Sequence, residues 1–167
     1  MTAVQLDTDT AAAVAGTQAQ YLTFVLAGEE YGVDILRVQE IKGWDSATPI
    51  PNTPDYIRGV INLRGTIVPI VDLRRRFEMA MADYGPTTVV IVLKVQGADR
   101  MRIIGIVVDA VSDVCSVAEG ELRPPPDFGG SVSVDFIRGL ATSDGKMIIL
   151  LDIDHLLNAV TTTPATG

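Results

Sequence analysis

The sequence predicts a mainly β protein built from two small five-stranded barrels. Short runs rich in Val, Ile, Leu and Thr alternate with turns containing Gly and Pro along most of the 167 residues, a pattern typical of strands. The pattern of residues 56–73 recurs at residues 136–153, after a shift of 80. Matching glycines indicate matching turns, because glycine adopts positive φ freely. About five short strands per copy is a number that closes into a barrel.

The first half of the chain is expected to contain five strands and one helix. The apolar residues at positions 35, 38 and 41 also fit a helical stripe, so a helix stays open there. Asp72 follows an apolar run and is suited to capping a helix over residues 73–81. The expected strands cover residues 22–26, 31–35, 38–44, 59–63 and 66–71.

The second half repeats this plan. Asp152 takes the place of Asp72, before an expected helix over residues 154–160, and Tyr31-Gly32-Val33 resembles Ile104-Gly105-Ile106 at a slightly different shift. The expected strands cover residues 88–95, 101–109, 110–117, 137–141 and 146–151. The first barrel is expected at about residues 19–82 plus part of the C-terminal segment, and the second at about residues 83–150. Both lie in one domain, residues 19–160, between flexible tails at residues 1–18 and 161–167.

Composition favours a binding module in the cytoplasm. The net charge of −8 disfavours nucleic acid, and the charge-free apolar runs are too short for membrane insertion. No Lys or Arg precedes Arg37, which argues against a signal peptide. One His and one Cys are too few for a zinc site, and no phosphate-binding loop or dinucleotide fingerprint occurs. We therefore expect no catalytic residue, no metal and no cofactor.

Two longer stretches resemble the CheW family, the coupling proteins of bacterial chemotaxis. They are residues 29–41, Glu-Glu-Tyr-Gly-Val-Asp-Ile-Leu-Arg-Val-Gln-Glu-Ile, and residues 54–74, which include Asn-Leu-Arg-Gly and Pro-Ile-Val-Asp-Leu. Residues 107–114 resemble its second half, and the likeness runs from about residue 20 to 158. The resemblance implies two SH3-like β-barrels packed side by side, with short helices after the strands ending at Asp72 and Asp152.

The resemblance also implies a function and partners. It implies a non-catalytic adaptor that joins the cytoplasmic helical tip of chemoreceptors to the regulatory domain of the histidine kinase CheA. Such a protein is cytoplasmic, associated with membrane receptor arrays, and can take part in ring or array assembly. The alternatives are a similar scaffold in a parallel, non-chemotactic kinase pathway, or a small-ligand-binding β-barrel, or an enzyme with an unrecognised carboxylate pair. The ligand-binding or enzymatic alternative predicts a deep, enclosed cavity with convergent polar groups.

The family match supports Arg64, Val38 and Glu40 as receptor contacts, and the other candidate residues follow from their places on the expected strands and turns. Arg64 at a hairpin tip offers a rigid fork of hydrogen-bond donors. Val89 and Val90 are neighbours on one strand, so their side chains face opposite sides, and one of them is core while the other can line a groove. The sequence leaves open which one. Gly59 is expected mainly to allow a turn, so a bulky replacement would weaken partner binding by distorting the loop. Receptor-binding candidates are Val38, Glu40, Arg64, Val89 and Val90; kinase-binding candidates are Ile35, Ile41 and Gly59.

Overall fold

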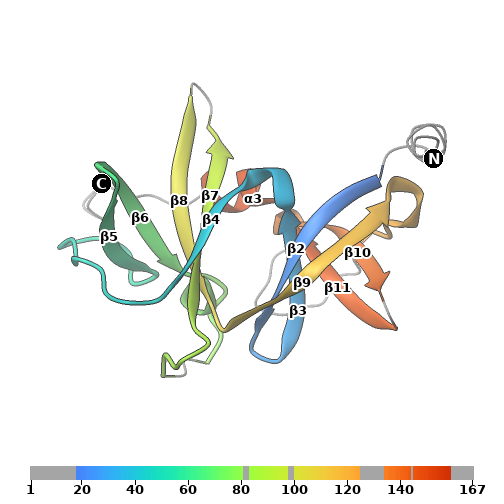
Figure 1. Ribbon diagram of the computed structural model, residues 1–167, viewed down its shortest axis with the longest axis horizontal. Coiled ribbons are helices and arrows are strands. Elements are labelled where there is room, and N and C mark those ends of the chain that lie inside the picture. Colours follow the sequence, from blue (N-terminus) through green and yellow to red (C-terminus); the bar gives the residue numbers. More distant parts are fainter. Residues whose placement is uncertain (1–17, 81–82, 98–99, 125–133, 144, 159–167) are drawn as a thin grey trace, which may run out of the picture.

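The strands form two five-stranded sheets that lie side by side (Figure 1). The computed structural model describes residues 18–80, 83–97, 100–124, 134–143 and 145–158. The prediction of a mainly β fold with two five-stranded barrels is confirmed. The expected C-terminal tail lies outside the described residues, as does the N-terminal one except for Gln18, which is the first residue of a strand.

The central barrel is formed by consecutive strands. Its sheet order is β4-β7-β8-β6-β5, with β6 and β8 parallel and the other pairs antiparallel. The strands are β4 (Val38–Gly43), β5 (Ile57–Leu63), β6 (Thr66–Asp72), β7 (Val89–Gln96) and β8 (Met101–Val108). A short helix, α2 (Leu73–Arg76), follows β6.

The terminal barrel combines the two ends of the chain. Its sheet order is β10-β11-β3-β2-β9, with β3 and β11 parallel. The strands are β2 (Gln18–Leu26), β3 (Glu29–Asp34), β9 (Ala110–Ala118), β10 (Ile137–Ser143) and β11 (Lys146–Leu151). The 3-10 helix η1 (Ile35–Arg37) leads from β3 into the central barrel, and α3 (Ile153–Asn158) follows β11. Two further 3-10 turns are η2 (Glu119–Glu121) and η3 (Val134–Phe136).

The division of the chain between the barrels differs from the expected one, in which residues 19–82 with part of the C-terminal segment form the first barrel and residues 83–150 the second. Strands β4 to β8 form the central barrel, while β2 and β3 pair with β9 and β11 in the terminal barrel. Apolar alternation identifies strands but does not say which strands pair. The open choice over residues 35–44 is also settled, as a 3-10 turn followed by β4.

Both aspartates cap helices as expected. The Asp72 carboxylate accepts a hydrogen bond from the Arg75 amide at 3.3 Å, and the Asp152 carboxylate accepts one from the His155 amide at 3.0 Å. The helix after Asp72 ends at Arg76 rather than at residue 81. It ends there because Glu78 has a positive φ of 59°, which breaks the right-handed helical path.

The predicted repeat is confirmed in the hairpins β5–β6 and β10–β11. Each hairpin shifts register at the same place, between Ile57 and Gly59 in one and between Ile137 and Gly139 in the other. The amide of Asp72 donates to the Tyr56 carbonyl at 2.7 Å, and at the equivalent place the amide of Asp152 donates to the Phe136 carbonyl at 2.8 Å. Equivalent hydrogen bonds show that the two copies share one backbone plan.

Paired hydrogen bonds between backbone groups close each sheet into a barrel. Thr48, after β4, exchanges two hydrogen bonds of 2.9 Å with Val60 on β5. Arg123, after β9, exchanges bonds of 2.9 and 2.8 Å with Leu140 on β10. Each bridge joins the two edges of a sheet, where unpaired backbone groups would otherwise be exposed.

The largest hydrophobic core lies between the barrels, not inside either one. It takes side chains from β2 and β3 of the terminal barrel, from β7 and β8 of the central barrel, and from both α-helices; among them Phe24, Tyr31, Leu93, Ile106 and Leu157 are fully or almost fully buried. Each barrel interior has a smaller core of its own. The barrels therefore form one body, because the burial of this shared surface stabilises both.

Asp109 joins the two barrels where the chain returns from β8 to β9. Its carboxylate accepts hydrogen bonds from Arg74 of α2 at 2.9 and 2.6 Å and from the Ala27 amide at 2.9 Å. Burial by itself raises the pKa of Asp109. The hydrogen bonds from Arg74 and Ala27 and the charge of Arg74 outweigh burial, so the pKa lies below its ordinary value.

Asp109→Asn is expected to lower the free energy of unfolding at pH 7 by about 1–2 kcal/mol, because the charged partner of Arg74 is lost. A lowered folded-state pKa contributes stability above the unfolded-state value near 4 and loses it as the pH falls through the folded-state value. The difference between the two proteins should therefore shrink as urea unfolding is repeated from pH 7 toward pH 3. Asp55→Asn, which removes a longer and more exposed pair with Arg75, is the control. A difference that stays constant with pH would contradict this assignment.

Candidate functional site

Arg64 lies at the tip of the β5–β6 hairpin. Arg64 and Gly65 both have positive φ, 51° and 89°, as the central residues of a type I′ turn do. The Asn62 side chain accepts a hydrogen bond from the Gly65 amide at 2.8 Å and holds the turn. The Arg64 side chain is 67% exposed and forms an ion pair with Glu40 of β4. Because the Arg64 end of this pair is exposed, the pair contributes little to stability and the Arg64 charge remains available for recognition.

A β-bulge separates the two candidates on β4. The register of β4 against β7 shifts between Val38 and Glu40, so that Val38 lies opposite Leu93 and Glu40 opposite Val92. Leu93 belongs to the shared core and Val92 to the interior of the central barrel. Val38 consequently lies on the face toward the terminal barrel, and Glu40 on the other face with Arg64.

The choice between Val89 and Val90 is settled by burial. Val90 is 3% exposed and belongs to the core inside the central barrel. Val89 is half-buried and packs against the shared core between the barrels. Among the candidates for the receptor, Val38 and Val89 therefore lie on the side facing the terminal barrel, Glu40 and Arg64 are paired, and Val90 is inaccessible.

The kinase candidates differ in accessibility. Ile41 is 43% exposed, and Ile35 is half-buried against the shared core. Gly59 is buried, with φ of +137°, and a Cβ there would overlap the Thr48 backbone. Gly59 therefore supports the closure of the central barrel, and any effect of its replacement on partner binding would be indirect.

Exposed apolar side chains recur at equivalent positions of the two barrels, a feature that sequence analysis missed. Ile67 on β6 and Met147 on β11 are 80 residues apart and both 59% exposed. Ile41 on β4 and Val114 on β9 are both 43% exposed. Each follows a β-bulge by two residues, at Gln39 in β4 and at Ser112 in β9, so the two side chains occupy equivalent positions of the two sheets. For Ile67 and Met147, the sequence repeat could have revealed that the two positions are equivalent, because each residue follows a hairpin glycine by two positions.

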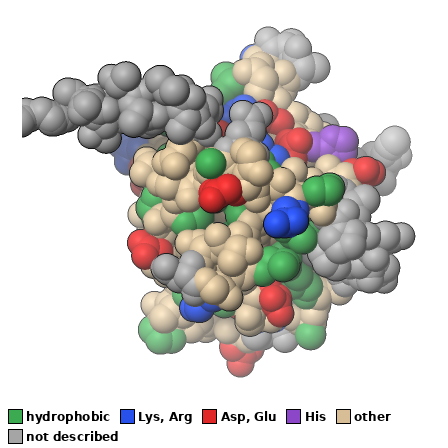
Figure 2. All heavy atoms as spheres, turned by 90° about the vertical axis from the view of Figure 1, so that its right-hand side faces the viewer, with side chains coloured by type: hydrophobic (Ala, Val, Ile, Leu, Met, Phe, Trp, Pro, Cys, Tyr) green, Lys and Arg blue, Asp and Glu red, His purple; other side chains and the backbone are tan. Residues whose placement is uncertain are grey.

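On the terminal barrel, apolar side chains are interspersed with acidic and basic ones (Figure 2). A hollow of about 340 Å³ on this barrel is lined by both polar and apolar side chains, including Thr23, Glu30, Val114 and Lys146. The Ser112 hydroxyl donates to the Glu30 carboxylate at 3.0 Å, and the Thr23 hydroxyl donates to the Asp113 carbonyl at 3.0 Å. The Thr23 and Ser112 hydroxyls in the hollow therefore already have partners within the chain.

The interiors of both barrels are packed with side chains. Leu63, Val68, Ile70, Val92 and Val107 contribute to the central one. Tyr21, Val117, Ala141, Ile148 and Leu150 form the terminal one. Packing of this kind favours docking surfaces over the enclosed ligand cavity that the alternative predicts. Within the described ranges, none of the helices combines the length and apolar character that a membrane span requires.

Comparisons with known proteins give one family. The CheW-like domain family matches residues 20–161. Chemotaxis protein CheW of Klebsiella aerogenes is 49% identical over 140 residues, which are 84% of this chain and 82% of that protein. Chemotaxis protein CheW of Rhizobium meliloti is 39% identical, covering 82% and 86%. Protein FrzA of Myxococcus xanthus is 30% identical, covering 87% and 89%. The crystal structure of scaffolding protein TtCheW from Thermoanaerobacter tengcongensis is similar with a TM-score of 0.76 and 34% identity, covering 89% of this chain and 93% of that one.

Proposed function

The chain belongs to the CheW family of chemotaxis adaptors, and from this premise we propose that it couples chemoreceptors to a CheA-type histidine kinase within receptor arrays. The observation that carries the proposal is the 49% identity with a chemotaxis CheW protein over 84% of the chain. The adaptor acts by binding both partners, without chemistry of its own. Two sites on one rigid body raise the effective concentration of kinase at the receptor.

The receptor's cytoplasmic helical tip docks across the β4 edge of the central barrel. It contacts Val38 and Val89 on the side that faces the terminal barrel, and Arg64, which lies with Glu40 on the other face, fixes its register. Val38 and Val89 are half-buried on that side and supply apolar contact area. Arg64 is exposed and keeps donors beyond those that pair with Glu40. Receptor helices that carry carboxylate or amide side chains would engage those donors.

The kinase's regulatory domain docks on an apolar surface around the half-buried Ile35 and the exposed Ile41. The recurrence of exposed apolar side chains at equivalent positions, Ile41 with Val114 and Ile67 with Met147, supports contacts of barrel against barrel. Each barrel then presents a similar surface, which also suits a repeated assembly such as a ring or array.

Reconstitution tests the coupling. Membranes that contain a chemoreceptor are mixed with the purified kinase and pelleted, with and without this protein. The kinase is expected to pellet with receptors only when the protein is added, and the protein itself is expected to bind each partner separately. Kinase recruitment that is independent of the protein would refute the coupling role.

A scaffold in a parallel kinase pathway is the second candidate. It has weaker support, the 30% identity with Protein FrzA against 49% with the Klebsiella aerogenes protein. Isolation of the protein from its own cells distinguishes the two, because the coupling role predicts a chemoreceptor and a CheA-type kinase in the same complex.

A further inference from the structure

Strand pairing divides the chain into two copies of one plan, and each copy contributes to both barrels. Repeat 1 runs from β2 to α2 and repeat 2 from β7 to α3, and both have the order hairpin, single strand, hairpin, helix. The terminal barrel joins the first hairpin of repeat 1 to the last three strands of repeat 2, and the central barrel does the reverse. Among the described strands, each ladder outside the hairpins therefore joins one repeat to the other.

The ladders between the repeats match in register. Leu150 on β11 lies opposite Gly32 on β3, and the equivalent Ile70 on β6 lies opposite Gly105 on β8. A Cβ at either glycine would lie 2.8 Å from a methyl carbon of its partner, so the two glycines permit the same close contact. Each repeat therefore offers the same pair of strand edges, which is the property of a self-complementary interface with two-fold symmetry.

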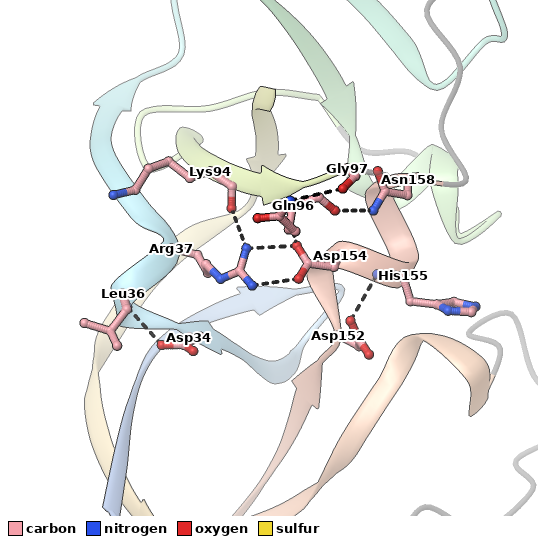
Figure 3. Close-up of polar contacts among 10 residues, drawn as sticks. All are labelled: Asp34, Leu36, Arg37, Lys94, Gln96, Gly97, Asp152, Asp154, His155 and Asn158. Carbon is pink, nitrogen blue, oxygen red and sulfur yellow. Dashed lines mark hydrogen bonds and ion pairs between the residues drawn. The ribbon is translucent and has the colours of Figure 1, made fainter. Parts of the chain in front are cut away.

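Two ion pairs break this symmetry at equivalent places. Arg37, directly before β4, donates to both carboxylate oxygens of Asp154 on α3, at 2.9 and 2.7 Å, and to the Lys94 carbonyl at 3.2 Å (Figure 3). Asp109, directly before β9, accepts hydrogen bonds from Arg74 on α2 at 2.9 and 2.6 Å. The strands β4 and β9 are equivalent, and Arg74 and Asp154 are each the second residue of their helix. Repeat 1 thus supplies both arginines, and repeat 2 supplies both aspartates.

The ion pairs select which repeats combine. The strand edges alone would allow repeat 1 to combine with another repeat 1, but Arg37 would then face Arg74 at both places. Two copies of repeat 2 would likewise bring Asp109 against Asp154. The four charged side chains are between 16% and 32% exposed, so solvent screens these repulsions only in part. A repeat 1 therefore combines with a repeat 2, whichever chain supplies it.

We propose that a second copy of this chain is a partner that binds by exchange of repeats, so that repeat 1 of one copy combines with repeat 2 of the other. The exchanged dimer rebuilds the ladders and ion pairs between repeats, and it holds two complete two-barrel bodies. The chain must open at residues 85–88, a turn in which the Thr88 amide donates to the Gly85 carbonyl at 3.1 Å. This short connection holds the repeats of one chain at an effective concentration of about 1 mM, so wild type is expected to be mainly monomeric below that concentration. Exchange does not depend on the coupling of receptor and kinase.

Charge reversal on two separate full-length chains tests the exchange. Arg37→Asp and Asp154→Arg each place like charges together within one chain. In an exchanged heterodimer the reversed repeat 1 meets the reversed repeat 2 and the two unchanged repeats meet each other, so both ion pairs are restored. Relief of each repulsion should favour the heterodimer about tenfold, and the two together about a hundredfold. Refolding the two variants together from urea at about 100 µM should therefore give mainly heterodimer by native mass spectrometry, whereas wild type stays mainly monomeric.

Arg75→Asp and Asp55→Arg are the matched control. They change the net charge of their chains by the same amounts as the test variants. The Arg75–Asp55 pair, at 3.5 Å, lies wholly within repeat 1, so exchange cannot restore it. Refolded together at the same concentration, these two variants should form no more dimer than wild type.

A disulfide distinguishes exchange from contact between surfaces. Gln20 on β2 lies opposite Ser116 on β9, in a ladder between the repeats, and both residues are exposed. Gln20→Cys is added to the Arg37→Asp chain, and Ser116→Cys to the Asp154→Arg chain. Both chains also carry Cys115→Ser, which removes the native thiol. Opposite residues of antiparallel strands lie within disulfide range, so oxidation should join the two chains in the exchanged dimer.

The remaining outcomes refute the exchange. A mixture of the two test variants that stays monomeric, or stays unfolded, shows that restored ion pairs do not bring repeats of different chains together. A heterodimer without the interchain disulfide shows association through outer surfaces, with each chain keeping its own repeats. Equal amounts of heterodimer from the control variants show that net charge, and not the Arg37–Asp154 pair, governs association.

Discussion

Gly59→Ala is expected to remove most of the stability of the fold. A Cβ at Gly59 would lie 2.6 Å from the Thr48 carbonyl carbon and 3.0 Å from the Pro49 nitrogen, and closer still to the Thr48 oxygen. Backbone atoms cannot rotate away as a flexible side chain can, so the Thr48–Val60 bridge must open. The φ of +137° adds strain for any residue with a side chain. We expect a loss of about 4 kcal/mol or more in urea unfolding, out of the 5–15 kcal/mol typical of a domain.

Gly139 provides a control inside the same molecule. It occupies the same position in the other hairpin, after a shift of 80, yet its φ is not in the positive range. A Cβ there would lie 3.3 Å from the Arg123 carbonyl, which a small movement relieves. Gly139→Ala should therefore cost about 1 kcal/mol. Equal losses in the two variants would show that the bridge at Thr48 is not the source of the effect.

The sequence predicted those features that depend on residues close together in the chain. Asp72 and Asp152 were identified as caps because capping needs only the next three residues. The hairpin repeat was found through Gly65 and Gly145, both of which have positive φ in the structure. The pairing of β3 with β11 joins residues more than a hundred positions apart, and it is fixed by the shared core rather than by any local pattern.

The candidate surfaces show the same limit. The alternation of Val89 and Val90 indicated that one is buried, but only the sheet register decides that it is Val90. The ion pair between Glu40 and Arg64 spans 24 residues and depends on the curvature of the barrel, so spacing alone did not reveal it.

Arg64→Glu is expected to lower affinity for a receptor cytoplasmic fragment about thirtyfold, or about 2 kcal/mol. The substitution removes the exposed guanidinium and places a second carboxylate beside Glu40, so the local charge becomes strongly negative. Isothermal titration with the receptor fragment measures the effect. Folding should change little, because the native pair is exposed on the Arg64 side and contributes little to stability. Affinity for the kinase's regulatory domain should stay within about twofold of wild type.

Arg75→Glu separates a specific role of Arg64 from the effect of charge on the whole molecule. Each substitution replaces one positive charge by one negative charge, so both change the net charge of −8 by the same amount. Arg75 also belongs to a solvent-exposed pair, with Asp55, but it lies on α2 rather than on the hairpin tip. If long-range repulsion governs receptor binding, both variants lose affinity equally and lose less of it at high salt. If Arg64 contacts the receptor directly, only Arg64→Glu loses affinity and added salt does not restore it. Full receptor affinity in Arg64→Glu would remove Arg64 from the receptor surface.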